Sequence, residues 1–376
     1  MSELQTQTGQ RPPFLFLLDK DFNKVEIIEG NRPNYSVGSI IWTTSFNKAD
    51  SFSANIPINR ELNRKMIDKI MSDETIFILR NDTMQIQWIT RKKFEEGALV
   101  LDGQGLESLY AKRFTNDIDY LPTGPNLDVN FVGRVMCDII NSSDPFVWSY
   151  AERLDNNTGP SIATFTESTG NVYKYLQNLS KTWNIAYGFK YNPAYMRADF
   201  YTKGIIKLSQ MIPNRTYKLY ESLGNIQPVG YTRDTEKAMN YVRVMGEEGI
   251  TAFVDARPLD ASSQPIGEKY SFSIKTKAKK TELISEPDYL SLLKAEGRQE
   301  LAKRQIDESF EVQPTQDVNI DIGWEVDVGS KSLNITRVLF CTEIKEVWEG
   351  GYHKTITLGF KEDPREIEVA RLSQEI

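Results

Sequence analysis

Hydrophobic and polar positions alternate through much of the first third of the chain. In residues 51–58, Phe52, Ala54, Ile56 and Ile58 alternate with mostly polar residues, which is typical of a half-buried strand. The same reasoning predicts further short strands at residues 14–18, 24–29, 39–45, 75–80, 85–90 and 98–101. The first third is therefore predicted to be rich in β structure.

The middle of the chain combines helical spacing with one hairpin. Apolar residues spaced three and four apart predict amphipathic helices at residues 62–70, 132–140 and 172–183. After the third helix, alternation resumes in residues 185–191, turns at Asn192 and returns through residues 198–200. The last two helices and this hairpin predict a small α+β unit.

The last third returns to strand-like patterns, interrupted by one long helix. Ser285 is predicted as the N-cap of this helix, Pro287 lies in its first turn, and Asp288 completes a capping box. The helix is expected to reach residue 309, and Gly297 is expected to weaken it by about 1 kcal/mol relative to alanine. Strands are predicted at residues 241–245, 250–255, 270–275, 318–328, 334–340, 343–349 and 353–360.

One glycine pair resembles the opening of a dinucleotide-binding site. Gly103 and Gly105 follow an apolar strand and precede a segment carrying Leu106 and Leu109. A dinucleotide fingerprint needs a third glycine, and Ser108 stands in its place. No GK[ST] sequence indicates a phosphate-binding loop either. The pair is therefore interpreted as a tight turn between a strand and a helix, and no cofactor is expected.

A second stretch resembles the start of a calcium-binding loop. Asp317, Asn319 and Asp321 match the first ligands of an EF-hand, but Ile322 and Val328 stand where that loop needs glycine and glutamate. The polar residues also alternate with apolar ones. They are therefore interpreted as the solvent face of a strand, and no metal site is expected.

The few histidines and cysteines exclude most common catalytic designs. His353 is the single histidine, so histidine-based zinc sites lack their other ligands. His353 lies in a hairpin-like stretch and no GxSxG motif accompanies it, so no catalytic residue is expected. Cys137 and Cys341 are expected to be small buried hydrophobic residues. A carboxylate pair of the glycosidase kind stays open, because 52 acidic residues allow many pairs.

Net charge and hydropathy bear on nucleic-acid binding, secretion and membrane insertion. Its 376 residues carry a net charge of −7, which argues against sequence-specific nucleic-acid binding. Residues 14–18 are too short for a secretory signal, and no apolar run approaches the roughly 18 residues of a membrane span. We expect synthesis in the cytoplasm of the cell that makes the protein.

The order of the elements resembles that of hub proteins at the tip of phage tails. This group includes the baseplate hub of contractile tails and the N-terminal part of siphophage tail-associated lysins. Three stretches carry the resemblance: the strand, glycine turn and leucine-bearing segment that closes on Arg113; the sequence "GNVYKYLQNLSKTWNIAYGFKY"; and the C-terminal sequences "IDIGWEVDV", "NITRVLFCTEIKEVW" and "YHKTITLGF". The resemblance spans residues 13–360. Lysins continue into a hydrolase domain, for which residues 361–376 are too few, so no lytic role is carried over.

The resemblance implies an α+β, mainly β fold. It implies two β-barrel-like tube domains, an inserted α+β domain and a long helix between C-terminal strands. The expected boundaries are residues 1–114 for the first tube domain (with part of residues 196–225 as a possible completion), 115–215 for the inserted helix–helix–hairpin domain, 216–364 for the second tube-like domain with its helix at 285–309, and 365–376 for a C-terminal tail.

The resemblance also implies a structural role in a virion. The expected protein is a homotrimeric hub at the distal end of a phage tail, which closes the tail tube, organises the tip and takes part in host attachment and genome ejection. Its expected partners are further copies of itself, the distal tail protein or tube ring above it, the tape-measure protein and receptor-binding tip proteins. Two alternatives stay open: a glycan-binding or glycan-degrading tail enzyme, and the hub of a tail-like bacteriocin or injection machine.

Overall fold

The structure of the chain is a computed structural model. The ranges that it describes are residues 12–28, 38–57, 63–72, 76–95, 97–114, 118–120, 130–142, 146, 149–151, 161–162, 165–167, 171–207, 217–260, 262–276, 280, 285–302, 304, 306–316 and 318–360. The C-terminal tail predicted at 365–376 lies outside these residues.

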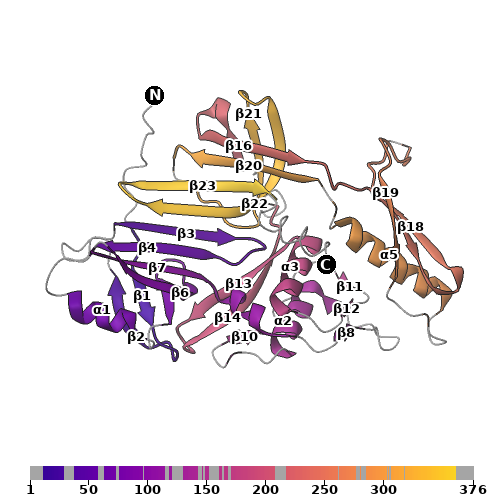
Figure 1. The fold of residues 1–376 in the computed structure, drawn as a ribbon. Coiled ribbons are helices and arrows are strands. Elements are labelled where there is room, and N and C mark those ends of the chain that lie inside the picture. Colours follow the sequence, from indigo (N-terminus) through magenta and orange to yellow (C-terminus); the bar gives the residue numbers. More distant parts are fainter. Residues whose placement is uncertain are drawn as a thin grey trace.

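The N-terminal part is an antiparallel β structure (Figure 1). Strand β3 pairs with β4, β4 with β7, β7 with β6, β6 with β5, and β5 with β1, which also pairs with β2. The strands are β1 (Leu15–Leu18), β2 (Lys24–Ile28), β3 (Ser39–Ser45), β4 (Ser51–Pro57), β5 (Phe77–Arg80), β6 (Gln85–Glu95) and β7 (Ala98–Gly105). Helix α1 (Asn63–Met71) joins β4 to β5. The predicted strands and the short helix are confirmed.

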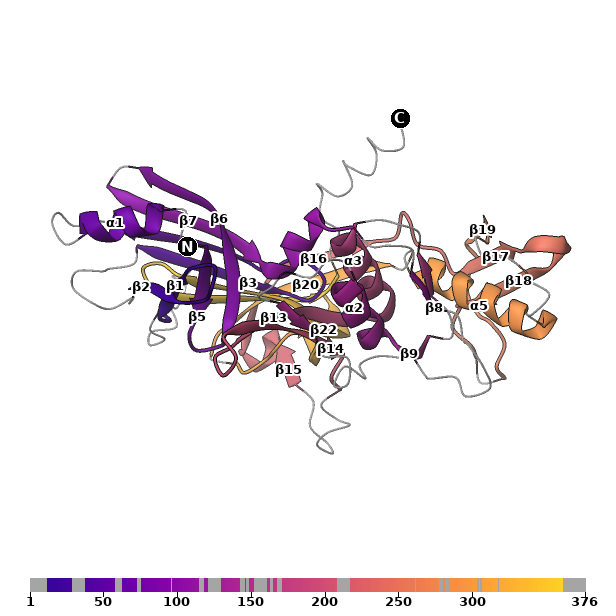
Figure 2. The ribbon, with the colours of Figure 1, turned by 90° about the horizontal axis from the view of Figure 1, so that it is seen from below.

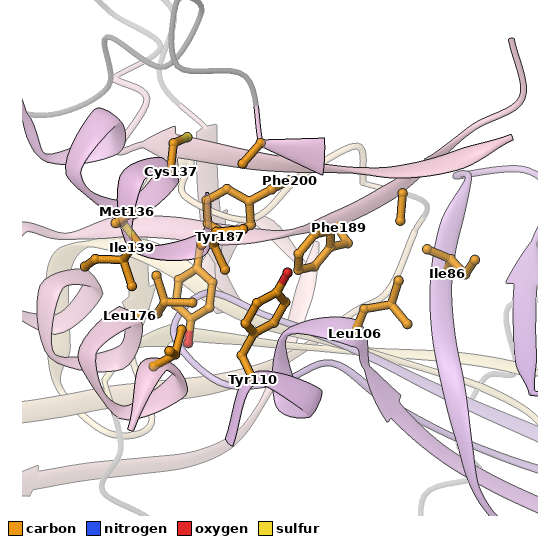
Figure 3. Close-up of a cluster of buried hydrophobic side chains, with 14 of the residues drawn as sticks. Ile86, Leu106, Tyr110, Met136, Cys137, Ile139, Leu176, Tyr187, Phe189 and Phe200 are labelled. Atoms are coloured by element: carbon orange, nitrogen blue, oxygen red, sulfur yellow. The ribbon is translucent and has the colours of Figure 1, made fainter. Parts of the chain in front are cut away.

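The middle part places helices α2 (Val132–Ser142) and α3 (Val172–Trp183) beside the hairpin of β13 (Ile185–Asn192) and β14 (Arg197–Gly204). Both helices and the hairpin are confirmed. Their apolar faces fill one core together with residues from the N-terminal part, including Tyr110 (Figure 3). This part also contains five short strands, of which β10 pairs with β14, β9 with β11 and β8 with β12: β8 (Ile118–Tyr120), β9 (Asn130–Phe131), β10 (Ser149–Ala151), β11 (Ser161–Ile162) and β12 (Phe165–Glu167).

Local polar contacts set both ends of α3. The Asn171 side chain accepts a hydrogen bond from the Lys174 backbone N–H at 3.1 Å, which satisfies a donor in the first turn. At the other end Asn184 adopts φ of 52°, the left-handed conformation that ends many helices. The chain then enters β13 directly, so the helix and the hairpin form one continuous unit.

The C-terminal strands join the N-terminal ones in a shared sheet. Strand β22 pairs antiparallel with β3 from Glu343–Ser45 to Trp348–Ile40, and β23 and β20 continue the sheet to β16. Among the described residues, sixteen strands are connected in this way. The strands of this part are β15 (Tyr217–Tyr220), β16 (Ile226–Asp234), β20 (Asp307–Pro314), β21 (Glu325–Ser330), β22 (Ile335–Trp348) and β23 (Tyr352–Gly359).

A smaller unit is inserted between β16 and β20, and we call residues 239–304 the α5 module. It consists of β17 (Tyr241–Met245), β18 (Thr251–Asp255), β19 (Ser271–Lys275) and helix α5 (Glu286–Ala302). Tyr289 and Leu293 of α5 pack with Val242 and Val244 in a separate core. The module and α1 lie at opposite ends of the elongated molecule (Figure 2).

Several sequence-based boundaries are wrong. Helix α5 ends at Ala302 and not near residue 309, because β20 begins at Asp307 and buries Phe310 and Val312 between β16 and β23. The strands predicted at 334–340 and 343–349 are one strand, β22 (Ile335–Trp348), with an irregular register between Cys341 and Glu343 where the pattern suggested a break. Strands β15, β16 and β20 were not predicted. The mainly β, α+β class is confirmed.

Candidate functional site: the carboxyl pair beside the paired glycines

The two glycines of the opening motif lie inside strand β7 and not in a turn. This corrects the predicted turn: these glycines are explained by neighbouring groups that lie where a Cβ atom would be. A Cβ atom on Gly103 would lie 2.0 Å from the Phe52 ring and 2.5 Å from the Trp88 backbone oxygen. A Cβ atom on Gly105 would lie 1.9 Å from Glu107 Oε1. Gly103 therefore requires glycine because a backbone oxygen and a packed ring occupy the place of a side chain, whereas at Gly105 that place is taken by the end of the Glu107 side chain.

The segment after β7 is also wound more tightly than the predicted helix. Residues Leu106–Lys112 form a 3-10 helix, η1, with Leu106 and Tyr110 fully buried. The predicted apolar face is correct, but the helix type is not. A second polar feature lies on η1: Glu107 is only 3% exposed, although its residue type favours the surface.

Glu107 meets Asp50, which ends the turn between β3 and β4. The Asp50 backbone N–H donates to Glu107 Oε1 at 3.0 Å. The Asp50 carboxylate accepts from the Ser45 N–H at 2.8 Å, and the Asp50 carbonyl accepts from the Gly105 N–H at 2.8 Å. We call Asp50 and Glu107 the carboxyl pair. It joins the β3–β4 turn to β7 and η1.

Both carboxyl groups have raised pKa values, so each holds its proton more readily than an exposed carboxyl group does. Burial raises the pKa of Glu107 to about 7. Burial, together with the Glu107 charge, raises the pKa of Asp50 well above its usual range, while the hydrogen bond from Ser45 lowers it. Because the two groups interact, they titrate as a pair. Perturbed carboxyl groups of this kind mark candidate functional positions.

A second polar cluster connects the N-terminal strands to the C-terminal hairpin. Arg80, at the end of β5, is 5% exposed in its side chain and pairs with Asp82 at 2.7 Å and with Glu346 on β22. Its guanidinium lies 5.9 Å and 5.0 Å from the ring centres of Trp42 and Trp348, within the range of cation–π attraction. Tyr352 also donates to Glu346, at 2.8 Å. This cluster supports the junction of β3 and β22.

The other residues singled out from the sequence take structural positions. His353 lies on β23 opposite Val347, in the predicted hairpin. Cys137 on α2 and Cys341 on β22 are fully buried, as predicted. None of these three residues belongs to the carboxyl pair or the Arg80 cluster.

For the acidic stretch that resembles a calcium loop, the predicted alternation is correct but the predicted strand is not. Asp317 lies outside the described residues. Asn319 and Asp321 are exposed and Ile320 and Ile322 are buried, so the predicted alternation is correct. The strand itself begins only at Glu325, which corrects the predicted strand at 318–328. Asp321 pairs with Lys203 at 2.6 Å and accepts from the Ile322 N–H, so its carboxylate is occupied by protein groups.

Sequence reasoning missed Asp50, Glu107 and Arg80. The single available signal was Glu107 itself, an acidic residue directly after Leu106 in a segment predicted to carry the apolar residues Leu106 and Leu109. Asp50 and Arg80 carry no such signal, because their partners come from other strands. In the part of the chain that the structure describes, no helix is long and apolar enough to cross a membrane.

Comparison with known proteins identifies the architecture. No protein-family model matches the chain, and no curated protein matches it in sequence. Three solved structures match nearly end to end. The chain has the fold of phage tail proteins.

The first of these is a tail protein from Neisseria meningitidis MC58, with a TM-score of 0.55, 12% identity, and coverage of 94% of this chain and 97% of that one. The second is the 43 kDa tail protein of prophage MuSo2 from Shewanella oneidensis, with a TM-score of 0.54, 9% identity and coverage of 92% and 98%. The third is prophage tail protein gp18 from Listeria monocytogenes EGD-e, with a TM-score of 0.51, 10% identity and coverage of 96% and 99%. The fold expected from the resemblance to tail proteins is therefore confirmed.

Proposed function

We propose that this chain is a structural protein of a phage tail, and specifically a homotrimeric hub that closes the distal end of the tail tube. The observation that carries the proposal is the end-to-end correspondence with three tail proteins, two of them from prophages, each matched over at least 97% of its own length.

The arrangement of the strands is compatible with a ring. Each chain would contribute two tube-like β domains, one from residues 1–114 and one from residues 216–364, so that three chains would form a pseudo-six-fold ring below the tail tube. The pairing of β3 with β22 gives the two β regions of one chain a shared sheet. A net charge of −7 suits a ring through which DNA passes, because few cations are available to bind phosphates.

The proposed role is mechanical and not enzymatic. Three charged or titratable side chains in the described residues make structural contacts: Arg80 binds Glu346, Asp321 binds Lys203, and Glu107 accepts a backbone hydrogen bond. Within the virion, the hub would contact the tube ring or distal tail protein above it, the tape-measure protein and the receptor-binding tip proteins. It would take part in host attachment and open a path for DNA when host binding favours one of its states.

The solution mass of the purified protein tests the trimer. One chain weighs 43.1 kDa, so light scattering after size-exclusion chromatography is expected to give about 129 kDa, the mass of three chains in a closed ring. Electron microscopy of the same peak is expected to show a central channel. A dimer would contradict the proposal, because a two-fold assembly does not match a three-fold tip. A monomer would also contradict self-assembly, and cryo-electron microscopy of intact tails would then count the copies at the tip.

A further inference from the structure

The turn between β3 and β4 is tied to the helical part of the molecule by two consecutive residues. The Ala49 N–H donates to the Tyr173 hydroxyl on α3 at 2.8 Å. The Asp50 N–H donates to Glu107 on η1, and the Asp50 carbonyl accepts from Gly105. Through these bonds one short turn connects the N-terminal sheet to both η1 and α3.

The closest contact at this junction depends on a carboxyl group. Gly105 leaves no side chain between the end of β7 and the Glu107 carboxyl, which lies 1.9 Å from the position that a Cβ atom would take. Glu107 is 3% exposed. A charged carboxylate in such a place loses most of its hydration, so its neutral form fits the closed junction better.

Charged and titratable groups on several neighbouring elements face the pair. Glu107 on η1 and Glu343 on β22 both disfavour ionisation of Asp50, whereas Lys190 on β13 favours it. Tyr201 on β14 is also close, and burial, together with the charges of Asp50 and Glu107, raises the pKa of its hydroxyl. Tyr173 contributes its hydroxyl from α3. Two acidic groups thus raise the pKa of Asp50 and one lysine lowers it. The net effect of these charges disfavours an ionised Asp50 beside an ionised Glu107.

We propose that the carboxyl pair is a pH-sensitive contact between the β3–β4 turn and the η1–α3 helices, which is tight while Glu107 is protonated and loosens when Glu107 ionises. The inference rests on hydrogen bonds and burial within one chain and is independent of the tail role. Its consequence is that the N-terminal sheet and the helical part separate more readily as the pH rises.

The direction of the pH dependence follows from proton binding. Glu107 has an ordinary pKa of 4.5, which applies when the junction is open, and a pKa of about 7 when it is closed. Between these values the closed form binds more protons than the open form, so opening becomes more favourable as the pH rises and levels off above about pH 7. One proton changes the opening equilibrium by about tenfold per pH unit.

Hydrogen exchange measured by mass spectrometry on the full chain tests the proposal. Protection factors of the peptide covering residues 45–51, corrected for the intrinsic pH dependence of amide exchange, are expected to fall by at least about 40-fold between pH 5 and pH 7. Glu107→Gln keeps an oxygen that accepts the Asp50 N–H but does not titrate. In this variant the protection factor is expected to depend less steeply on pH, because the contribution of one proton, about tenfold per pH unit, is lost. In the double variant Asp50→Asn/Glu107→Gln the protection factor is expected not to change with pH.

A matched control and a second single variant keep the test decisive. Glu236→Gln changes an exposed glutamate outside the junction, so it is expected to retain the wild-type slope. If the double variant fails to fold, Asp50→Asn alone provides the second comparison, with a smaller slope expected. Equal slopes in the wild type, Glu107→Gln and Asp50→Asn would overturn the proposal, and so would a wild-type protection factor that does not change with pH.

Discussion

At the residue scale, the two glycines of β7 differ in what they make room for. Gly103 admits the Phe52 ring and the Trp88 carbonyl oxygen, whereas Gly105 admits the carboxyl of Glu107. The first neighbours are a packed ring and a backbone atom, which cannot move far. The second neighbour is the end of a side chain. The cost of a methyl group should therefore be greater and more purely steric at Gly103.

Gly103→Ala is expected to lower the free energy of unfolding by about 2–3 kcal/mol, because overpacking forces the β4 and β6 backbones to shift. Urea denaturation followed by fluorescence measures the change. The matched control is Gly230→Ala on β16, where the new Cβ atom would find its nearest neighbour at 3.9 Å. The control is expected to change stability by less than about 0.5 kcal/mol. Equal losses in both variants would show that β propensity, and not the close approach, governs Gly103.

Sequence patterns located residues that face a core, but not the polar residues that join separate segments. The stripe from Val132 to Ile140 was readable because burial repeats with the helical period. Asp50 and Glu107 lie 57 positions apart, and Arg80 and Glu346 lie 266 apart. No local period connects such partners, so their pairing arises only from the tertiary fold.

At the element scale, helices and strands were predicted correctly where the apolar residues of one buried face recur with the period of that element. Helices α2 and α3 and the β13–β14 hairpin follow this rule. Strand β20 failed it, because it begins soon after α5 and Ile306, four residues after Ala302, continues the helical spacing of that helix. Pairing with β16 and β23 decides the strand, and those partners lie far away in the sequence.

The contact between β5 and β22 depends on Arg80. Arg80→Ala would leave Glu346, 14% exposed in its side chain, without its cationic partner. Removing one partner of a buried ion pair typically costs about 3–5 kcal/mol, and we expect a loss near the lower end of that range because Tyr352 still donates to Glu346. Thermal and urea unfolding measure it.

Arg91→Ala is the control for this variant. Arg91 is 60% exposed in its side chain and lies 3.9 Å from Asp102, and exposed pairs of this kind contribute about 0–1 kcal/mol. If Arg80→Ala were no more destabilising than Arg91→Ala, the Arg80 cluster would not hold β5 and β22 together.

At the scale of the whole molecule, the α5 module has a core of its own. Gly297 explains how α5 approaches its sheet: a Cβ atom there would lie 2.8–3.1 Å from Val254, Val244 and Val242. The glycine that lowers helix propensity thus permits close packing of helix on sheet. A unit with a separate core is expected to open separately from the rest of the chain.

Leu293→Ala is expected to destabilise the α5 module by about 2–5 kcal/mol, because Leu293 is fully buried in its core. Hydrogen exchange is expected to increase in residues 241–302 and to stay unchanged in β3, β4 and β7. The control Lys294→Ala removes an exposed side chain of the same helix and is expected to leave exchange unchanged. Faster exchange throughout the chain would mean that the module and the large sheet unfold as one unit.

The pairing of β3 with β22 also has a consequence for how the protein is made. Trp348 and Tyr352 complete the core that contains Leu15, Ile40 and Trp42, so this core stays unfinished until the ribosome has synthesised β22 and β23. At about 5–20 residues per second, the wait lasts on the order of tens of seconds. During that time the edge of β3 that will bind β22 is exposed to other nascent chains. The yield of folded protein is therefore expected to depend on translation speed and on chaperones that cover this edge.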